Sequence, residues 1–148
     1  MTPFAFLPSS HKPGTLGRSN LPWLPMNTNV RSARARSMLP RIRILHGRNI
    51  ALGPGKVELL ALIGQTGSIN RAARQIDMSY MRAWSLVRTM NRCFRKPLVR
   101  VARGGEGGGG AALTETGAKV VTLYQQMEDA TLRASAASWR QLRRLLRS

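Results

Sequence analysis

The side chains best suited to chemistry in this chain are the arginines and hydroxyls of residues 79–94. This stretch contains no acidic residue, and its polar side chains recur on the side opposite an apolar stripe. A guanidinium can donate two hydrogen bonds to O6 and N7 of guanine, which discriminates that base by roughly 1–3 kcal/mol. We therefore expect one helix to contact bases, with Arg82 the leading residue among Ser79, Tyr80, Arg82 and Ser85.

A second group of residues is suited to phosphate groups rather than to bases. Free backbone N–H groups at a helix start attract anions, and neighbouring cations hold a protein in register without identifying sequence. Glycines let backbone N–H groups approach a flat anionic surface. The residues expected on the DNA backbone are Ser68, Arg71, Arg74, Arg88, Arg103, Gly104 and Gly105.

Each of these assignments has a plainer alternative. Arg82 and Arg74 could be solvated helix arginines, and the glycine tract 104–110 could be a loop that binds nothing. Trp84 could pack under this tract or lie against the DNA backbone. Packing is favoured for Trp84 because large aromatic side chains in small domains are usually part of the core.

No comparable pattern of residues indicates catalysis or metal binding. The acidic residues are scattered, and neither His11 nor His46 has a local carboxylate or serine arrangement. The single cysteine, Cys93, rules out an internal disulfide and a zinc finger of the usual four-ligand type. Gly104 to Gly110 is not followed by the Lys-Ser or Lys-Thr that a nucleotide-binding loop needs. We expect no enzyme, no cofactor and no metal.

Breaks and periodicity predict the elements that position the candidate residues. The alternation of apolar and polar side chains in residues 41–52 predicts a short hairpin, and the apolar spacing of residues 56–64 predicts a helix. Gly67 can end that helix and Ser68 can cap the next. A short helix over 69–76, a turn at Asp77-Met78 and a longer helix over about 79–94 then form a helix-turn-helix.

The second half of the chain predicts a hairpin followed by a long helix. Short apolar runs flank the glycine tract, so residues 103–111 form the tip of a wing. Thr114 caps a helix over 115–133. The apolar stripe of this helix has no evident cover in so small a domain, which predicts pairing of two chains through Val120, Leu123, Tyr124 and Met127.

These elements predict a mainly α fold with a small β wing, a winged helix-turn-helix with a long C-terminal dimerisation helix. Residues 1–40 are expected to form a disordered, basic, proline-rich extension, although the true start could be Met26 or Met38. Residues 41–114 form the DNA-binding domain and 115–133 the dimerisation helix. Residues 134–148 form a basic tail that could contain a terminal helix.

The charge of the chain indicates a polyanionic partner. There are 24 Lys and Arg residues against 6 Asp and Glu, a formal net charge of +18. A field of this sign repels itself unless an anionic partner neutralises it, so double-stranded DNA is the leading candidate and a basic structural or ribosomal protein the alternative. The longest apolar stretch, residues 57–63, is too short to span a bilayer. We expect no membrane contact and a cytoplasmic, nucleoid-associated location.

Several motifs together resemble the DNA-binding domain of the ModE-type molybdate-responsive regulators. They are the segment 67–73 (GSINRAA), the segment 78–84 (MSYMRAW), residues 91–98, and the glycine tract with the ALTETG that follows it. The match covers about residues 41–127. This resemblance implies a LysR-like winged helix-turn-helix, and a bacterial transcription regulator that binds an inverted repeat as a homodimer.

The resemblance also implies a difference in sensing. Members of that family carry oxyanion-binding domains after the dimerisation helix, whereas this sequence ends at Ser148. Residues 135–139 could be a remnant of such a domain or a chance match, and molybdate is not expected to bind this chain. The alternative function is a non-specific, nucleoid-type nucleic-acid binder. Arg82→Ala separates the two, because only a specific regulator would lose preference at one operator position.

Overall fold

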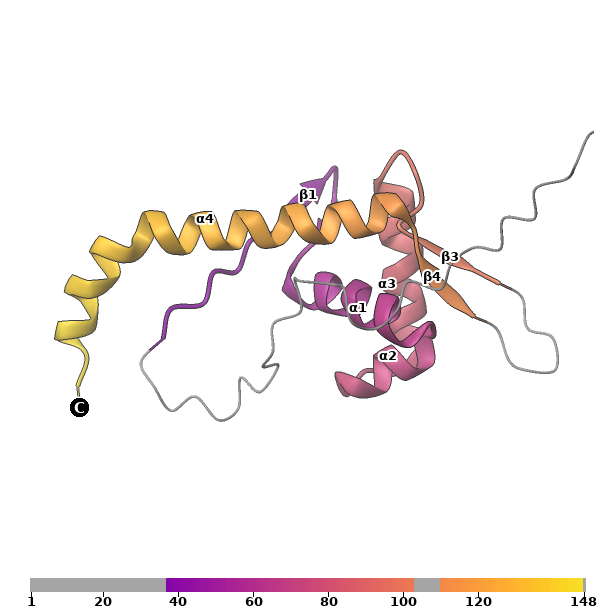
Figure 1. The fold of residues 1–148 in the computed structure, drawn as a ribbon, viewed down its shortest axis with the longest axis horizontal. Helices are drawn as coiled ribbons and strands as arrows, with labels where there is room; N and C mark the ends of the chain where they lie inside the picture. The colour runs from indigo at the N-terminus through magenta and orange to yellow at the C-terminus, as the bar shows by residue number, and fades with distance from the viewer. Residues whose placement is uncertain (1–36, 103–109, 148) are drawn as a thin grey trace, which may run out of the picture.

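The computed structural model describes residues 37–102 and 110–147. In chain order the elements are β1 (Ile44–His46), β2 (Asn49–Leu52), α1 (Pro54–Thr66), α2 (Ile69–Gln75), α3 (Tyr80–Cys93), β3 (Val99–Val101), β4 (Ala111–Leu113) and α4 (Glu115–Leu145) (Figure 1). The strands form two separate antiparallel pairs, β1 with β2 and β3 with β4. The described part of the chain is therefore mainly helical with small β hairpins, as the sequence predicts.

Three of the helices begin at a hydroxyl side chain that caps their free N–H groups. The Arg71 N–H donates to Ser68 Oγ at α2, the Arg82 N–H to Ser79 Oγ at α3, and the Gly117 N–H to Thr114 Oγ1 at α4. Such a cap satisfies a donor that the helix itself leaves unpaired. All three caps were expected from the sequence and are confirmed.

Two backbone positions with positive φ make the connections between α1, α2 and α3 tight. Gly67 has φ 65° and its N–H donates to Ile63 O, which ends α1 in the left-handed conformation. Asp77 has φ 52° between α2 and α3, and the Met78 N–H turns back to donate to Ala73 O at 2.9 Å. The predicted turn at Asp77-Met78 is thus present. α3 itself ends at Cys93, earlier than the predicted Phe94.

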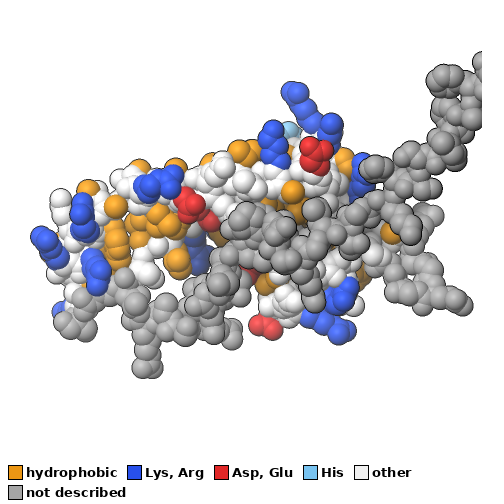
Figure 2. All heavy atoms as spheres, in the orientation of Figure 1, with side chains coloured by type: hydrophobic (Ala, Val, Ile, Leu, Met, Phe, Trp, Pro, Cys, Tyr) orange, Lys and Arg blue, Asp and Glu red, His pale blue; other side chains and the backbone are white. Residues whose placement is uncertain are grey.

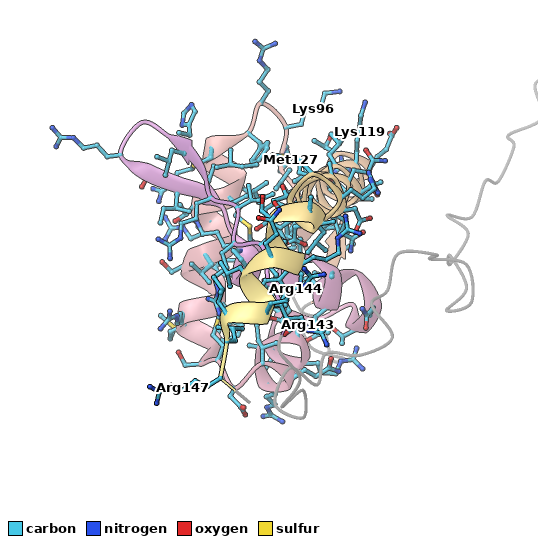
Figure 3. The ribbon with its side chains drawn as sticks, turned by 90° about the vertical axis from the view of Figure 1, so that its left-hand side faces the viewer. Lys96, Lys119, Met127, Arg143, Arg144 and Arg147 are labelled. Carbon is cyan, nitrogen blue, oxygen red and sulfur yellow. The ribbon has the colours of Figure 1, made fainter. Side chains whose placement is uncertain are left out.

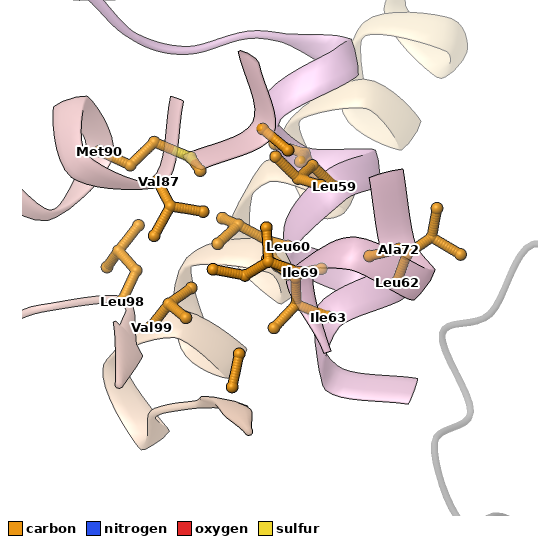
Figure 4. Packing of buried hydrophobic residues seen from close by; sticks show 14 of the residues in the cluster. Leu59, Leu60, Leu62, Ile63, Ile69, Ala72, Val87, Met90, Leu98 and Val99 are labelled. Carbon is orange, nitrogen blue, oxygen red and sulfur yellow. The ribbon is translucent and has the colours of Figure 1, made fainter. Parts of the chain in front are cut away.

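A single apolar cluster joins all four described helices to the β3–β4 hairpin. Ala72 and Ala73 of α2 are fully buried, and their small side chains allow neighbouring helices to approach closely. Figure 4 shows the centre of the cluster, where the labelled side chains are Leu59, Leu60, Leu62, Ile63, Ile69, Ala72, Val87, Met90, Leu98 and Val99. This core fixes α3 relative to α1, α2 and β3.

Helix α4 is continuous from Glu115 to Leu145. The predicted change from a helix to a tail at residue 133 is not marked by a break, because no glycine or proline follows Gly117 and most of the residues are good helix formers. Tyr124 is the last buried residue along the described part of the helix. Beyond it, α4 extends past the rest of the described chain (Figure 1).

Tyr124 belongs to the core, so its prediction as a dimerisation residue is wrong. Its side chain is 1% exposed and its hydroxyl donates to Ile42 O at 2.7 Å, because residues preceding β1 run along α4 (Figure 1). Burial raises the pKa of the Tyr124 phenol to about 12, and the Glu128 carboxylate adds to the shift. Val120 is partly buried against the core, whereas Leu123 and Met127 are 47% and 42% exposed.

Candidate nucleic-acid interface

The core sets the orientation of α3 and so decides which side chains it presents outward. Ala83, Val87 and Met90 form its buried stripe at i, i+4 and i+7. A shift of two residues corresponds to about 200° around a helix, which is nearly opposite. The line facing directly away from the core therefore consists of four exposed residues, Met81, Ser85, Arg88 and Arg92. We call these four residues the outward line.

The four residues predicted to contact bases are distributed around the start of α3. Ser79 is exposed but its hydroxyl oxygen is engaged as the helix cap. Ser85 lies on the outward line. Arg82 is exposed about 100° around the helix from Met81, at the edge of this line rather than on it. Tyr80 is exposed on the other edge.

Tyr80 and Trp84 form an aromatic pair at that edge. Their ring centroids lie 6.4 Å apart with an interplanar angle of 20°. Trp84 is partly buried and packs against the core, as expected, while Tyr80 remains exposed. The pair holds the Tyr80 ring beside the outward line.

The predicted phosphate-binding residues come from three segments: α2 with its cap, α3, and residues 103–105. Ser68 and Arg71 lie together at the start of α2, where the Arg71 guanidinium donates to Thr66 O. Arg74 is exposed in the last turn of α2. Arg88 lies on the outward line of α3, the same helix that carries Tyr80, Arg82 and Ser85. The remaining three, Arg103, Gly104 and Gly105, lie outside the described residues.

Asn91 is a positioning residue that the search for cationic and hydroxyl residues missed. Its amide nitrogen donates to Val99 O at 2.9 Å, and its amide oxygen accepts from the N–H groups of Leu98 and Val99 at 2.8 and 3.1 Å. These three bonds connect α3 directly to β3. An asparagine on the helix side that faces a following strand is the signal that could have identified it.

The β3–β4 hairpin is fixed on its second strand as well. The Ala111 N–H donates to Gly67 O at 2.9 Å, next to the start of α2. Thr114 bonds to two residues before β3, because its N–H donates to Leu98 O at 2.9 Å and its hydroxyl to Pro97 O at 2.8 Å. The base of the hairpin is therefore held against both α2 and α3.

The charged side chains on α3 and directly after it are cationic. Arg82, Arg88 and Arg92 are exposed on the helix, and Arg95 and Lys96 are exposed directly after it. Lys56 is different, because its ammonium group donates to Ile50 O and burial lowers its pKa. Within residues 37–102 and 110–147, no group of three or more His, Cys, Asp or Glu side chains could hold a metal ion. None of the helices described has the length and apolar character needed to cross a membrane.

Fold and surface together define a mainly α protein that presents a cationic, acid-free helix face beside a fixed β hairpin. No protein-family model matches the chain. Among curated proteins, it is similar to the molybdenum-pterin-binding protein MopB of Rhodobacter capsulatus, with 44% identity over 85 residues, 57% of this chain and 32% of MopB.

Two further relatives have names connected with molybdenum transport or transcription. The molybdenum transport protein ModE of Azotobacter vinelandii is 42% identical over 78 residues, 53% of this chain and 29% of the relative. The DNA-binding transcriptional dual regulator ModE of Escherichia coli K12 is 41% identical over 71 residues, 48% of this chain and 27% of the relative. The chain thus spans 27–32% of the length of these relatives.

Proposed function

We propose that this chain is a sequence-specific, DNA-binding transcription regulator of the ModE type, built as a winged helix-turn-helix. The observation that carries the proposal is the acid-free outward face of α3, with Ser85, Arg88 and Arg92 held opposite a buried stripe. The similarity of about half the chain to a DNA-binding transcriptional regulator of Escherichia coli supports it.

In this proposal α3 occupies the major groove, which is wide enough for a helix. Its first two turns face base edges, where Arg82 pairs with a guanine and Ser85 donates or accepts a hydrogen bond. The start of α2, with Ser68 and Arg71, contacts phosphates beside the groove. The β3–β4 hairpin serves as the wing, and its tip at Arg103, Gly104 and Gly105 contacts the backbone or the neighbouring minor groove.

The proposed active form is a homodimer paired through α4. Leu123 and Met127 are exposed, and the helix continues with the exposed apolar residues Leu132, Leu142 and Leu145. Figure 2 shows apolar side chains along the part of α4 that extends past the remaining helices. Pairing these surfaces would place two copies of α3 on one side of the duplex. Half-sites separated by about one helical turn, roughly 34–36 Å, are the expected operator geometry.

Selection of bound duplexes from a random DNA library by the full chain tests this function. An enriched inverted repeat supports it, and tight binding without enrichment contradicts it. Arg82→Ala is then measured on the enriched site and on single-base variants of it, with Arg140→Ala on α4 as the control of equal charge change. We expect Arg82→Ala to relax preference at one position by about 1–3 kcal/mol, and Arg140→Ala to leave every preference unchanged.

A non-specific nucleic-acid binder is the second candidate, and the net charge of +18 favours it. Arg143, Arg144 and Arg147 lie at the C-terminal end of the described chain (Figure 3), and this end of α4 lies away from α3 (Figure 1). A charge-driven binder loses affinity with rising salt for every sequence. If Arg82→Ala and Arg140→Ala weaken binding equally on all duplexes, this second function holds.

The proposed function includes no enzyme activity, no cofactor and no molybdate binding, and it places the chain with the cytoplasmic nucleoid. The names of the relatives make molybdate the ligand to test. Titration of the full chain with sodium molybdate, followed by calorimetry, is expected to give no heat of binding. A saturable heat, or a change in operator affinity with molybdate, would overturn this part of the proposal.

A further inference from the structure

Met81 is an unusual residue for the outward line. Its side chain is 70% exposed, while the other three members of the line are a serine and two arginines. A single exposed apolar side chain is common on protein surfaces and needs no partner. The position of Met81 is what distinguishes it, because it is the first residue of the line and lies in the first turn of α3.

The surroundings of Met81 are also apolar. Tyr80 precedes it in the chain and is 48% exposed, and its ring is held by stacking on Trp84. The start of α3 therefore carries two exposed side chains with apolar parts, Met81 and Tyr80, next to the exposed arginines of the same helix. The N-terminal turn of a recognition helix is the part that most often contacts base edges.

The major groove offers one apolar group to such side chains. Thymine carries a methyl group at C5, whereas the groove edges of guanine, adenine and cytosine offer hydrogen-bond donors and acceptors. The methionine thioether is a weak acceptor and donates no hydrogen bond, so it cannot replace an arginine or asparagine at these edges. Its flexible, polarisable side chain is suited to packing on a methyl group.

We propose that Met81 packs against the C5-methyl group of a thymine and so determines one position of the operator half-site. This inference rests on the proposed function and deepens it by naming a base. Met81 and Ser85 are one turn apart on the same line, about 6 Å along the helix axis. The thymine should therefore lie within about two base steps of the position that Ser85 faces, at 3.4 Å per step.

Replacing thymine by deoxyuridine tests the inference, since this change removes only the methyl group. The duplex enriched by the full chain is prepared with deoxyuridine at each thymine in turn, and dissociation constants are measured for the wild type and Met81→Ala. We expect one deoxyuridine to weaken wild-type binding roughly fourfold, as burial of one methyl group implies. Met81→Ala should bind the thymine duplex more weakly and lose its response to that deoxyuridine. Met81→Leu should retain most of the response.

The controls separate the ways in which the result can fail. Ser85→Ala, on the same line, should keep the full response to the deoxyuridine, and circular dichroism checks that each variant is folded. A response that persists in Met81→Ala assigns the methyl contact to another residue and overturns the inference, as does a wild type insensitive to every deoxyuridine. In both cases the enriched site remains and the proposed function stands. If no site is enriched, the proposed function fails and the Met81 inference fails with it.

Discussion

The surfaces of α3 and α4 both carry exposed arginines, yet the two helices are anchored to the rest of the fold to different degrees. On α3, Arg88 and Arg92 lie opposite a buried stripe, and Asn91 connects the helix to β3 through three hydrogen bonds. On α4 beyond Tyr124 the arginines share the helix with exposed leucines, and no residue is buried. Cationic charge is thus common to both surfaces, and anchorage is what differs.

Anchorage decides what an arginine can do. Base recognition requires a guanidinium placed within hydrogen-bond distance of two specific acceptors, so the helix that carries it has to be fixed. The C-terminal half of α4 is not fixed in this way, and its exposed leucines are the ones that we propose to pack on a second copy. The comparison predicts that mutations of the residues that hold α3 and the start of α4 in place lower the free energy of unfolding. Mutations in the C-terminal half of α4 should leave the fold of a single chain intact.

The largest expected effect comes from Gly117, which is buried in the first turn of α4. A Cβ at this position would overlap Leu98 O and approach Leu113 Cδ1 to 2.7 Å. Because one of these atoms belongs to the backbone, α4 or β3 would have to move. Gly117→Ala should lower the free energy of unfolding by about 3 kcal/mol in urea denaturation. Gly55→Ala is the matched control, since a Cβ there meets nothing within 4 Å, and its stability should be unchanged or slightly higher.

Asn91→Ala should have the next largest effect, because it removes the bridge between α3 and β3. It leaves the Leu98 and Val99 N–H groups without their acceptor, so we expect a loss of about 2 kcal/mol in thermal or urea unfolding. Asn91→Asp retains the acceptor for these N–H groups but places a carboxylate oxygen opposite Val99 O, so it should also lower the stability. Equal stability of Asn91→Ala and the wild type would show that β3 does not depend on this anchor.

Local features of both regions could be predicted from the sequence. The caps at Ser68, Ser79 and Thr114 and the turn at Gly67 follow from single residues and their immediate neighbours. Each depends on a hydroxyl or a glycine next to a break in apolar periodicity, which is why these predictions succeeded.

Contacts between distant segments could not be predicted in the same way. Tyr124 fits an unpaired apolar stripe equally well, and only the fold shows that Ile42 O lies beside it. The hydrogen bonds of Asn91 to β3 could not be predicted from the sequence for the same reason. The exposure of Met81 was likewise not predicted, since it depends on how the rest of the fold packs around α3. Residues 103–105, predicted at the wing tip, lie outside the described residues.

Tyr124 is the last buried residue of α4, and its role in anchoring the helix can be tested through the pH dependence of stability. Its pKa is raised from 10.0 to about 12, chiefly by burial, so folding favours the neutral phenol. The associated stability is present below pH 10 and is lost as the pH rises from 10 toward 12. Tyr124→Phe should lose about 1 kcal/mol at neutral pH through the missing bond to Ile42 O. It should also show a weaker decline of stability between pH 10 and 12.

Tyr80→Phe is the control for this titration, because its ring is exposed on α3. The stability of Tyr80→Phe should follow the wild type across the alkaline range. An identical alkaline decline in Tyr124→Phe and the wild type would mean that the Tyr124 phenol does not contribute to it.

Leu142, in the C-terminal half of α4, should give the smallest effect on one chain. Its side chain is 51% exposed, so Leu142→Ala should change the free energy of unfolding of the monomer by no more than about 0.5 kcal/mol. If this part of α4 packs on a second copy, the same change weakens the dimer, and sedimentation measured over a range of protein concentrations would detect the shift toward monomer. Arg140→Ala, also exposed on α4, provides the control for changes outside the apolar surface. A loss of monomer stability as large as that of Asn91→Ala would instead show that the leucine is packed within its own chain, and the distinction between the two surfaces would fail.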